Sequence, residues 1–137
     1  MALDSVGASG GIEILWNTAE ISAEGWLGLP RIFTATFRQI GAEDKILISA
    51  VYGPSIPGER AKFLQNIRKL STMHHESYLI LGGDFNMILN LSEKKGGIRR
   101  EDPDMALFRE LLQDLHLVDI PTVNGDFTWN NRRGERF

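Results

Sequence analysis

Residues 78–86 read YLILGGDFN, and this stretch decides the fold class. Its first part, Tyr78–Leu81, is an uninterrupted apolar run that ends at Gly82-Gly83, which is typical of a short buried strand. Lys45–Tyr52 is a second, almost continuously apolar run, and Gly53-Pro54 stops it in the same way. Runs of this kind suit strands that are covered on both faces, as in α/β proteins.

Helical spacing appears between these two strands and again after them. Pro57–Ser71 is predicted to be a helix, with Pro57 in the first turn, where its missing N–H is tolerated. A second helix is announced by Asp102, a candidate N-cap, and by Pro103 after it. The apolar residues at helical intervals are Phe63, Leu64, Ile67 and Leu70 in the first helix, and Phe108, Leu111, Leu112 and Leu115 in the second.

Three further strands are predicted at Ile12–Trp16, Arg31–Arg38 and Phe127–Trp129. Strands therefore come first and then alternate with helices, which predicts the mixed α/β class. No repeat or linker divides the sequence, so a single domain over residues 1–137 is expected.

Composition narrows the function classes. The 15 basic and 18 acidic residues give a net charge of −3, which argues against nucleic-acid binding through bulk positive charge but leaves room for a local basic face. The absence of Cys excludes disulfides, thiolate zinc sites and thiol nucleophiles. No apolar run approaches the roughly 20 residues of a membrane span, and residues 1–4 do not resemble the start of a secretory signal. We therefore expect no membrane partner and a location in the nucleus or cytoplasm.

The strongest candidate site residues are Asp84 and Asn86, which directly follow the strand Tyr78–Leu81. At such a strand end both side chains can enter one cleft, with Asp84 acting on a water molecule and Asn86 donating to a developing oxyanion. The two glycines before them would let a substrate approach the backbone. Tyr52 ends the other apolar strand and could bind a phosphate through its hydroxyl. The alternatives are an Asx turn at Asp84 and a packing role for Tyr52.

Two basic clusters are candidate nucleic-acid contacts. Their members are Lys94, Lys95, Arg99 and Arg100 in the first, and Arg132 and Arg133 beside Trp129 in the second. Lys and Arg on glycine-containing loops suit contacts to phosphates, and Trp129 could stack on a base. The alternatives are solvated loops and a core position for Trp129.

Taken in order, these segments resemble the endonuclease/exonuclease/phosphatase superfamily, and more closely the endonuclease of plant LINE-type (non-LTR) retrotransposons. The segments that carry the resemblance are Ser9–Ile12 with Leu15-Trp16, Ile48–Pro54, Leu81–Asn86, Lys94–Gly97 and Asp126–Trp129. The resemblance implies a DNase I-like fold, in which two stacked sheets are flanked by helices, and Mg²⁺-dependent hydrolysis of phosphoesters. It also implies that Asp84 orients or deprotonates the attacking water, and that Asn86 and Tyr52 contact the phosphate.

The sequence departs from the superfamily at both ends of the pattern. The family's metal-binding Glu and its Ser-Asp-His motif have no counterpart here, so a central part of the domain is expected, forming a partial two-sheet sandwich. Without these groups we expect the isolated chain to bind Mg²⁺ only weakly and to be inactive or nearly so.

Two other functions stay open: a binding module for nucleic acid or protein that does not cut, and a phosphatase acting on small phosphoesters. The basic loops and Trp129 favour a polynucleotide over a small substrate. Weak DNA binding is therefore one expected interaction. Pairing of two copies through unpaired strands such as Ile12–Trp16 or Phe127–Trp129 is the other.

Overall fold

The computed structural model describes residues 1–4, 11–74, 78–96, 100–121, 123 and 127–128. The chain divides into two compact units, Met1–Met87 and Ile88–Phe137. Among the described residues, the first unit holds a four-stranded sheet, a two-stranded sheet and one long helix, and the second holds one helix and a short 3-10 turn. The mixed α/β class is thus confirmed, whereas the single domain over residues 1–137 stays a prediction.

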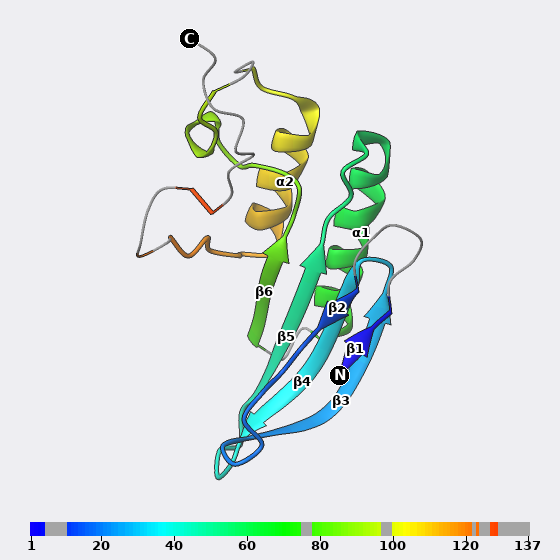
Figure 1. The fold of residues 1–137 in the computed structure, drawn as a ribbon, viewed down its shortest axis with the longest axis vertical. Coiled ribbons are helices and arrows are strands. Elements are labelled where there is room, and N and C mark those ends of the chain that lie inside the picture. The colour runs from blue at the N-terminus through cyan, green and yellow to red at the C-terminus, as the bar shows by residue number, and fades with distance from the viewer. Residues whose placement is uncertain (5–10, 75–77, 97–99, 122, 124–126, 129–137) are drawn as a thin grey trace. The chain divides into compact units, whose positions relative to one another are not determined.

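The four-stranded sheet has the order β3-β4-β5-β6 (Figure 1). Strands β3 (Ile21–Leu29), β4 (Ile32–Gln39) and β5 (Lys45–Tyr52) pair antiparallel, and β6 (Tyr78–Asp84) pairs parallel with β5. Helix α1 (Pro57–Met73) forms the crossover that a parallel pair requires. The carboxyl ends of β5 and β6 therefore meet at one edge of the sheet.

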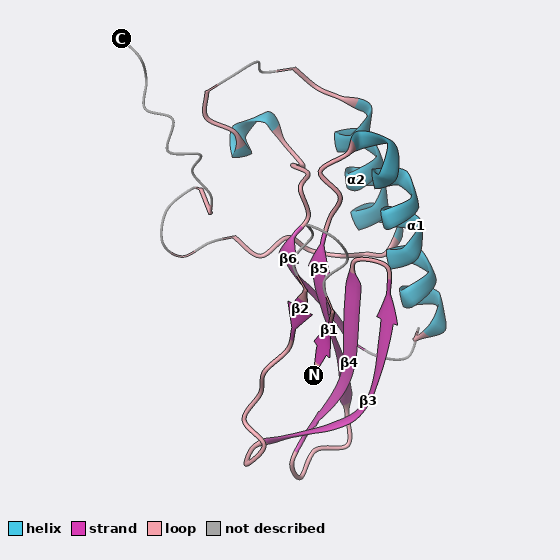
Figure 2. Cartoon of the chain, turned by 45° about the vertical axis from the view of Figure 1, so that its right-hand side comes forward, coloured by secondary structure: helices cyan, strands magenta, loops and turns pink. Residues whose placement is uncertain are grey.

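The first unit has an apolar layer on each face of this sheet (Figures 1 and 2). On one face lies α1, whose buried residues Phe63, Leu64, Ile67 and Leu70 are the four that helical spacing predicted. On the other lies the pair formed by β1 (Ala2–Leu3) and β2 (Ile12–Glu13), with β2 against β4 and β5. The core on that side consists of Ile14, Phe33, Ala35 and Phe37, with Trp16 edge-on to Phe37 at a ring-centroid distance of 5.3 Å.

A polar pair crosses the apolar interior between β4 and β5. Thr34 and Ser49 are opposite one another in the register, are buried, and share a hydrogen bond of 2.8 Å between their hydroxyl oxygens. This mutual bond satisfies two hydroxyl groups that water cannot reach. It explains how the strand Lys45–Tyr52 carries a polar residue at a fully buried position.

Most predicted elements are confirmed, and three strands are corrected. The buried strand predicted at Tyr78–Leu81 continues through both glycines to Asp84 as β6, and Tyr78 and Ile80 are 70% and 47% exposed because β6 is the last strand of its sheet. Lys45–Tyr52 is β5 with the predicted bounds, and Arg31–Arg38 shifts by one residue to β4. The strand predicted at Ile12–Trp16 is only Ile12–Glu13; beyond it Ile14 exchanges backbone hydrogen bonds with Met1 and packs into the core, whereas Leu15 is 79% exposed. Phe127 and Thr128 form no strand, since they have no ladder partner among the described residues, and Trp129 lies outside them.

Strand β3 was not predicted from the sequence; it contains two glycines and places Trp26, which is 66% exposed, on its outer face. The register of β3 with β4 shifts between Ala23 and Gly25, although half-buried and exposed residues alternate along the whole strand. Glu24, at this bulge, binds Arg38 of β4 at 2.6 Å and Lys45 of β5 at 2.7 Å. One carboxylate therefore joins three strands at this end of the sheet.

The Glu24 network makes stability depend on pH. Hydrogen bonds from Arg38 and then Lys45 lower the pKa of the Glu24 carboxyl from its ordinary 4.5 to about 2. Because the folded pKa lies below the unfolded one, the stabilisation is complete above about pH 4.5 and is lost as the pH falls towards 2. Glu24→Gln should lower the urea midpoint at pH 7, and this difference from the unsubstituted chain should disappear near pH 2.

The matched control is Glu13→Gln, because Glu13 is exposed on β2 and has no ion pair with a described residue. Its urea midpoint should follow that of the unsubstituted chain at both pH values. A Glu24→Gln difference of the same size at pH 2 and pH 7 would contradict a role for the ionised carboxylate.

Candidate functional site

The candidate site lies where β5 and β6 end side by side. Tyr52 and Asp84 are partners in the parallel register, so their side chains leave the same face of the sheet as neighbours. Both are exposed, Tyr52 at 37% of its full accessible area. In α/β sheets, ligands bind beyond the carboxyl ends of parallel strands, which is where this pair lies.

Asn86 joins this pair through a tight turn after β6. The Oδ1 atom of Asp84 accepts the backbone N–H of Asn86 at 2.9 Å, which is an Asx turn. Asn86 itself is left-handed, with φ of 51°, a conformation that Asn tolerates better than most residues. Its side-chain Nδ2 then donates to the carbonyl oxygen of Gly53 at 2.8 Å, directly after β5. The structure thus brings all three predicted residues, Tyr52, Asp84 and Asn86, to one rim.

Two glycines allow the strand ends to approach this closely. A Cβ at Gly53 would overlap the backbone of Phe85, and one at Gly83, where φ is 135°, would overlap the carbonyl of Val51. By contrast, a Cβ at Gly82 would meet nothing within 4 Å. The glycine pair was expected to admit a substrate; the structure shows that Gly83 instead admits the neighbouring strand.

The turn interpretation and the functional interpretation of Asp84 are compatible. One carboxylate oxygen holds the turn, and the exposed carboxylate retains a second oxygen. The Tyr52 hydroxyl and the Asn86 amide can donate hydrogen bonds to a phosphate, whereas the second Asp84 oxygen can accept one from a water molecule. Their catalytic roles stay predictions.

The described residues of this rim do not by themselves form a magnesium site. Among the described residues there is no group of three or more His, Cys, Asp or Glu side chains that could hold a metal ion. Of the described residues at the rim, Asp84 alone offers a carboxylate, and Mg²⁺ requires near-octahedral oxygen coordination.

The second unit carries the first basic cluster. Lys94, Lys95 and Arg100 are exposed, the first two directly after the 3-10 turn η1 (Leu91–Glu93). Arg99, Trp129, Arg132 and Arg133 lie outside the described residues.

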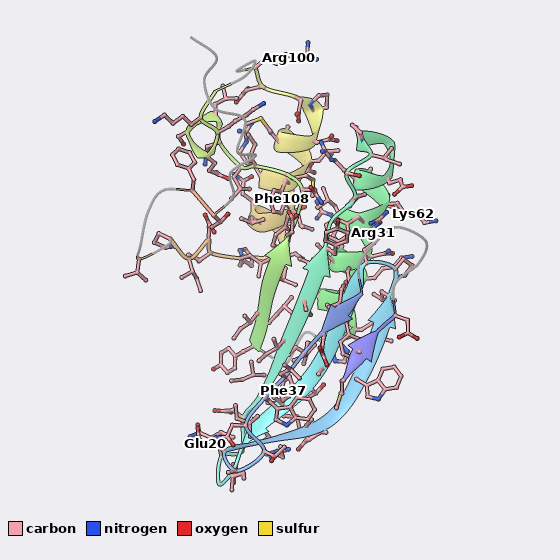
Figure 3. All side chains as sticks on the ribbon, in the orientation of Figure 1. Glu20, Arg31, Phe37, Lys62, Arg100 and Phe108 are labelled. Atoms are coloured by element: carbon pink, nitrogen blue, oxygen red, sulfur yellow. The ribbon has the colours of Figure 1, made fainter. Side chains whose placement is uncertain are left out.

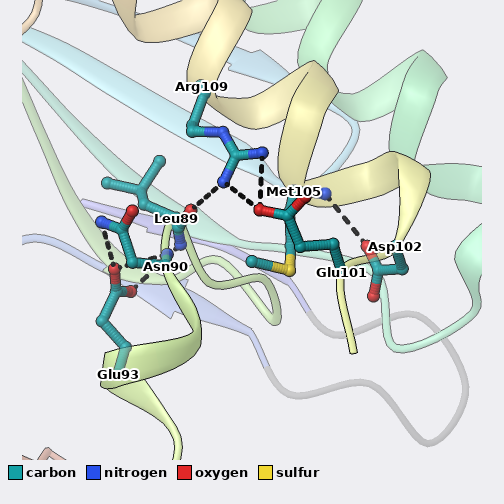
Figure 4. Close-up of polar contacts among 7 residues, drawn as sticks. All are labelled: Leu89, Asn90, Glu93, Glu101, Asp102, Met105 and Arg109. Atoms are coloured by element: carbon teal, nitrogen blue, oxygen red, sulfur yellow. Dashed lines mark hydrogen bonds and ion pairs between the residues drawn. The ribbon is translucent and has the colours of Figure 1, made fainter. Parts of the chain in front are cut away.

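The lysines follow a segment with well-defined polar contacts (Figure 4). Glu93 accepts the backbone N–H of Asn90 at 2.8 Å, closing a capping box at η1. Arg109 of α2 (Pro103–Asp114) donates to the Leu89 carbonyl at 2.9 Å and to Glu101 at 3.3 Å. These contacts fix the start of the lysine loop within its unit.

Helix α2 confirms the sequence signals at its start. Asp102 is the N-cap, and its side chain accepts the Met105 N–H at 3.0 Å, with Pro103 in the first turn. Phe108 and Leu111 are buried as predicted, and Met105 is buried as well. In the described part of the chain, no helix has the length and apolar character needed to cross a bilayer.

Sequence reasoning missed one contributor to the rim of the first unit, Gly53, and one anchoring contact of the second unit, Arg109. Gly53 acts through its backbone carbonyl, which no side-chain pattern reveals. Arg109 lies on the polar side of a predicted helix, where the sequence predicts a solvent-exposed side chain without a specific partner. Its only sequence signal is an acidic residue, Glu101, eight positions earlier.

Fold and site define a mixed α/β protein with a polar rim at the carboxyl end of a parallel strand pair. The chain is 34% identical over 71 residues to the "Transposon TX1 uncharacterized 149 kDa protein" of Xenopus laevis. The match covers 51% of this chain and 5% of that protein, so the chain is similar to a small part of a transposon protein. No protein-family profile matches the chain.

Proposed function

We propose that this chain is part of a retroelement-derived endonuclease of the endonuclease/exonuclease/phosphatase superfamily, whose parent hydrolyses phosphodiesters with Mg²⁺. The observation that carries the proposal is the convergence of Tyr52, Asp84 and Asn86 at one strand edge. The similarity to a transposon protein supports the retroelement relationship. The β1–β2 pair against β4 and β5 supports a partial second sheet.

We further propose that the isolated chain cuts DNA slowly or not at all and holds no Mg²⁺ stably. The superfamily's metal-binding Glu and its Ser-Asp-His motif have no counterpart in the sequence. Without them, neither metal-assisted charge stabilisation nor proton relay to the leaving group is available. Association of two copies through sheet edges also stays a proposal.

The proposal is testable by DNA affinity, which requires no catalysis. If phosphates bind at the rim without metal, the Asp84 carboxylate repels them, so Asp84→Asn should tighten binding of a duplex at low salt by about fivefold. Asn preserves the turn, because its side-chain oxygen can still accept the Asn86 N–H. The measurement is a fluorescence-anisotropy titration at two salt concentrations, without divalent ions.

The matched control is Asp44→Asn, which removes the same charge from the β4–β5 connection, at the opposite end of β5 from Tyr52. Its affinity should equal that of the unsubstituted chain. If Asp84→Asn and Asp44→Asn change DNA affinity equally, the change reflects only the net charge of the protein. That result would contradict a phosphate site at the rim.

Activity assays on the unsubstituted chain and Asp84→Asn distinguish the competing functions. Supercoiled plasmid with Mg²⁺ should be nicked no faster by the unsubstituted chain than by Asp84→Asn, and strong nicking that Asp84→Asn abolishes would overturn the proposed inactivity. DNA binding that ignores Asp84 would favour a non-catalytic binding module. Turnover of a small phosphomonoester would favour the phosphatase branch.

A further inference from the structure

The carboxamide of Asn86 has two N–H donors and one acceptor oxygen, and the structure uses one donor. Its Nδ2 donates to the Gly53 carbonyl at 2.8 Å, and no other described residue accepts from it. The side chain is half-buried and the Gly53 backbone is buried. The hydrogen bond is therefore sheltered from competing water.

The chemistry of the Gly53 contact fixes which end of the amide faces it. A flipped carboxamide would place the Asn86 Oδ1 against the Gly53 oxygen, acceptor against acceptor, which is unfavourable at hydrogen-bond distance. Gly53 is itself anchored, since its backbone N–H donates to the Asp84 carbonyl at 2.6 Å. Both polar groups of the Gly53 backbone thus bind the strand end that carries the candidate site.

The backbone of Asn86 is fixed as well. Its N–H is held by the Asp84 Oδ1, and its left-handed conformation is one that few residues other than Asn and Gly adopt readily. Backbone and side chain are therefore both determined before any ligand arrives. A pre-set donor avoids the ordering cost that a free side chain would incur on binding.

We propose that Gly53 is a positioning residue for phosphate recognition: its carbonyl holds one N–H of Asn86, so that the second N–H points in one fixed direction for a phosphoryl oxygen. This inference rests on the proposed function and adds to it a division of roles within the rim. One polar atom each of Asp84 and Asn86 maintains the turn and the strand contact. The second Asn86 N–H serves the ligand.

The test is a side-chain amide NMR experiment on the ¹⁵N-labelled chain, because the two Nδ2 protons give separate signals. In the free protein, the proton on Gly53 should exchange with water more slowly than its partner. Added inorganic phosphate, and then a short oligothymidylate, should shift the signal of the other proton and leave the Gly53-bound one in place. Equal exchange of both protons in the free protein would overturn the positioning role.

The titration also separates this inference from the proposed function. If Asp84→Asn alters DNA affinity but neither Asn86 proton responds to oligothymidylate, the positioning role is wrong and the proposed function stands. If the oligothymidylate perturbs none of Tyr52, Asp84 and Asn86, both are wrong.

The oligothymidylate affinity of Asn86 variants provides a second test. Asn86→Gly retains the left-handed conformation and the Asp84 contact but removes both side-chain donors, so oligothymidylate affinity should fall about tenfold. Asn86→Asp should fall further, because a carboxylate oxygen would face the Gly53 carbonyl. The charge-matched control is Asn17→Asp, in the turn before β3, which should not lower affinity. Unchanged affinity of Asn86→Gly would overturn the proposal.

Discussion

A Gly83→Ala chain is expected to lose about 3–5 kcal/mol of unfolding free energy, whereas Gly82→Ala should change it by less than about 1 kcal/mol. At Gly83 an added Cβ would overlap the Val51 carbonyl oxygen and lie 3.0 Å from the Val51 nitrogen. The φ of 135° is also a region that L side chains rarely adopt. At Gly82 neither obstacle exists, although the two residues are adjacent in β6.

Urea unfolding followed by circular dichroism measures both variants on the same chain. The Gly82 variant controls for the general effect of replacing glycine by alanine in a strand, which includes the lower entropy of the unfolded chain. A Gly83→Ala midpoint within error of the Gly82→Ala midpoint would show that β5 and β6 can separate without cost. It would then remove the physical basis for the closeness of Tyr52 and Asp84.

The glycine pair also shows how far sequence reasoning reaches. The apolar run followed by Gly-Gly and Asp-Phe-Asn predicted a strand that stops at the glycines, whereas β6 continues through both of them to Asp84 and the turn to Asn86 starts there. It could not predict which glycine is required, because the obstacle at Gly83 is the backbone of a different strand. Sequence periodicity reports which face of an element is apolar, but not the distance between two elements.

Local sequence patterns do not report contacts with other elements, which is also why α1 and β5 were predicted and β3 was missed. Helix α1 follows the helical period along its length and strand β5 is an almost continuously apolar run, so the positions of both could be predicted directly. In strand β3 the carboxylate of Glu24 pairs with Arg38 and Lys45, which lie on β4 and β5. Ion pairs with residues of two other strands leave no local signal in the sequence.

In the candidate site, too, some features could be predicted from the sequence and others depend on tertiary contacts. Tyr52, Asp84 and Asn86 could be singled out because their side chains follow strand-ending patterns. The register that makes Tyr52 and Asp84 neighbours, and the Gly53 carbonyl that holds Asn86, are tertiary facts. Their roles in binding remain to be measured by the DNA and NMR titrations.

Phe63→Ala is expected to destabilise the first unit by about 3–5 kcal/mol, as removal of a buried aromatic ring usually does. Phe63 is 3% exposed on α1, and its ring meets that of Phe85 edge-on, with centroids 6.5 Å apart. Phe85 is the residue between Asp84 and Asn86. The helix core therefore extends directly to the turn that carries the candidate site.

Two controls make the size of this loss interpretable. Lys62→Ala changes the preceding residue of α1, which is exposed and extends away from the sheet (Figure 3), and should alter stability by less than about 0.5 kcal/mol. Phe63→Leu retains most of the apolar volume and should cost less than about 2 kcal/mol. Urea unfolding of the three variants gives the comparison.

The ring pair should also affect the site before the unit unfolds. Without Phe63, the Phe85 side chain loses one wall of its packing, so the turn between Asp84 and Asn86 should open more often under native conditions. The Asn86 proton on Gly53 should then exchange with water faster in Phe63→Ala than in Phe63→Leu, by more than the difference in global stability explains. If exchange at Asn86 follows global stability alone, the turn is held by its own hydrogen bonds, and the helix contributes to the fold but not to the geometry of the rim.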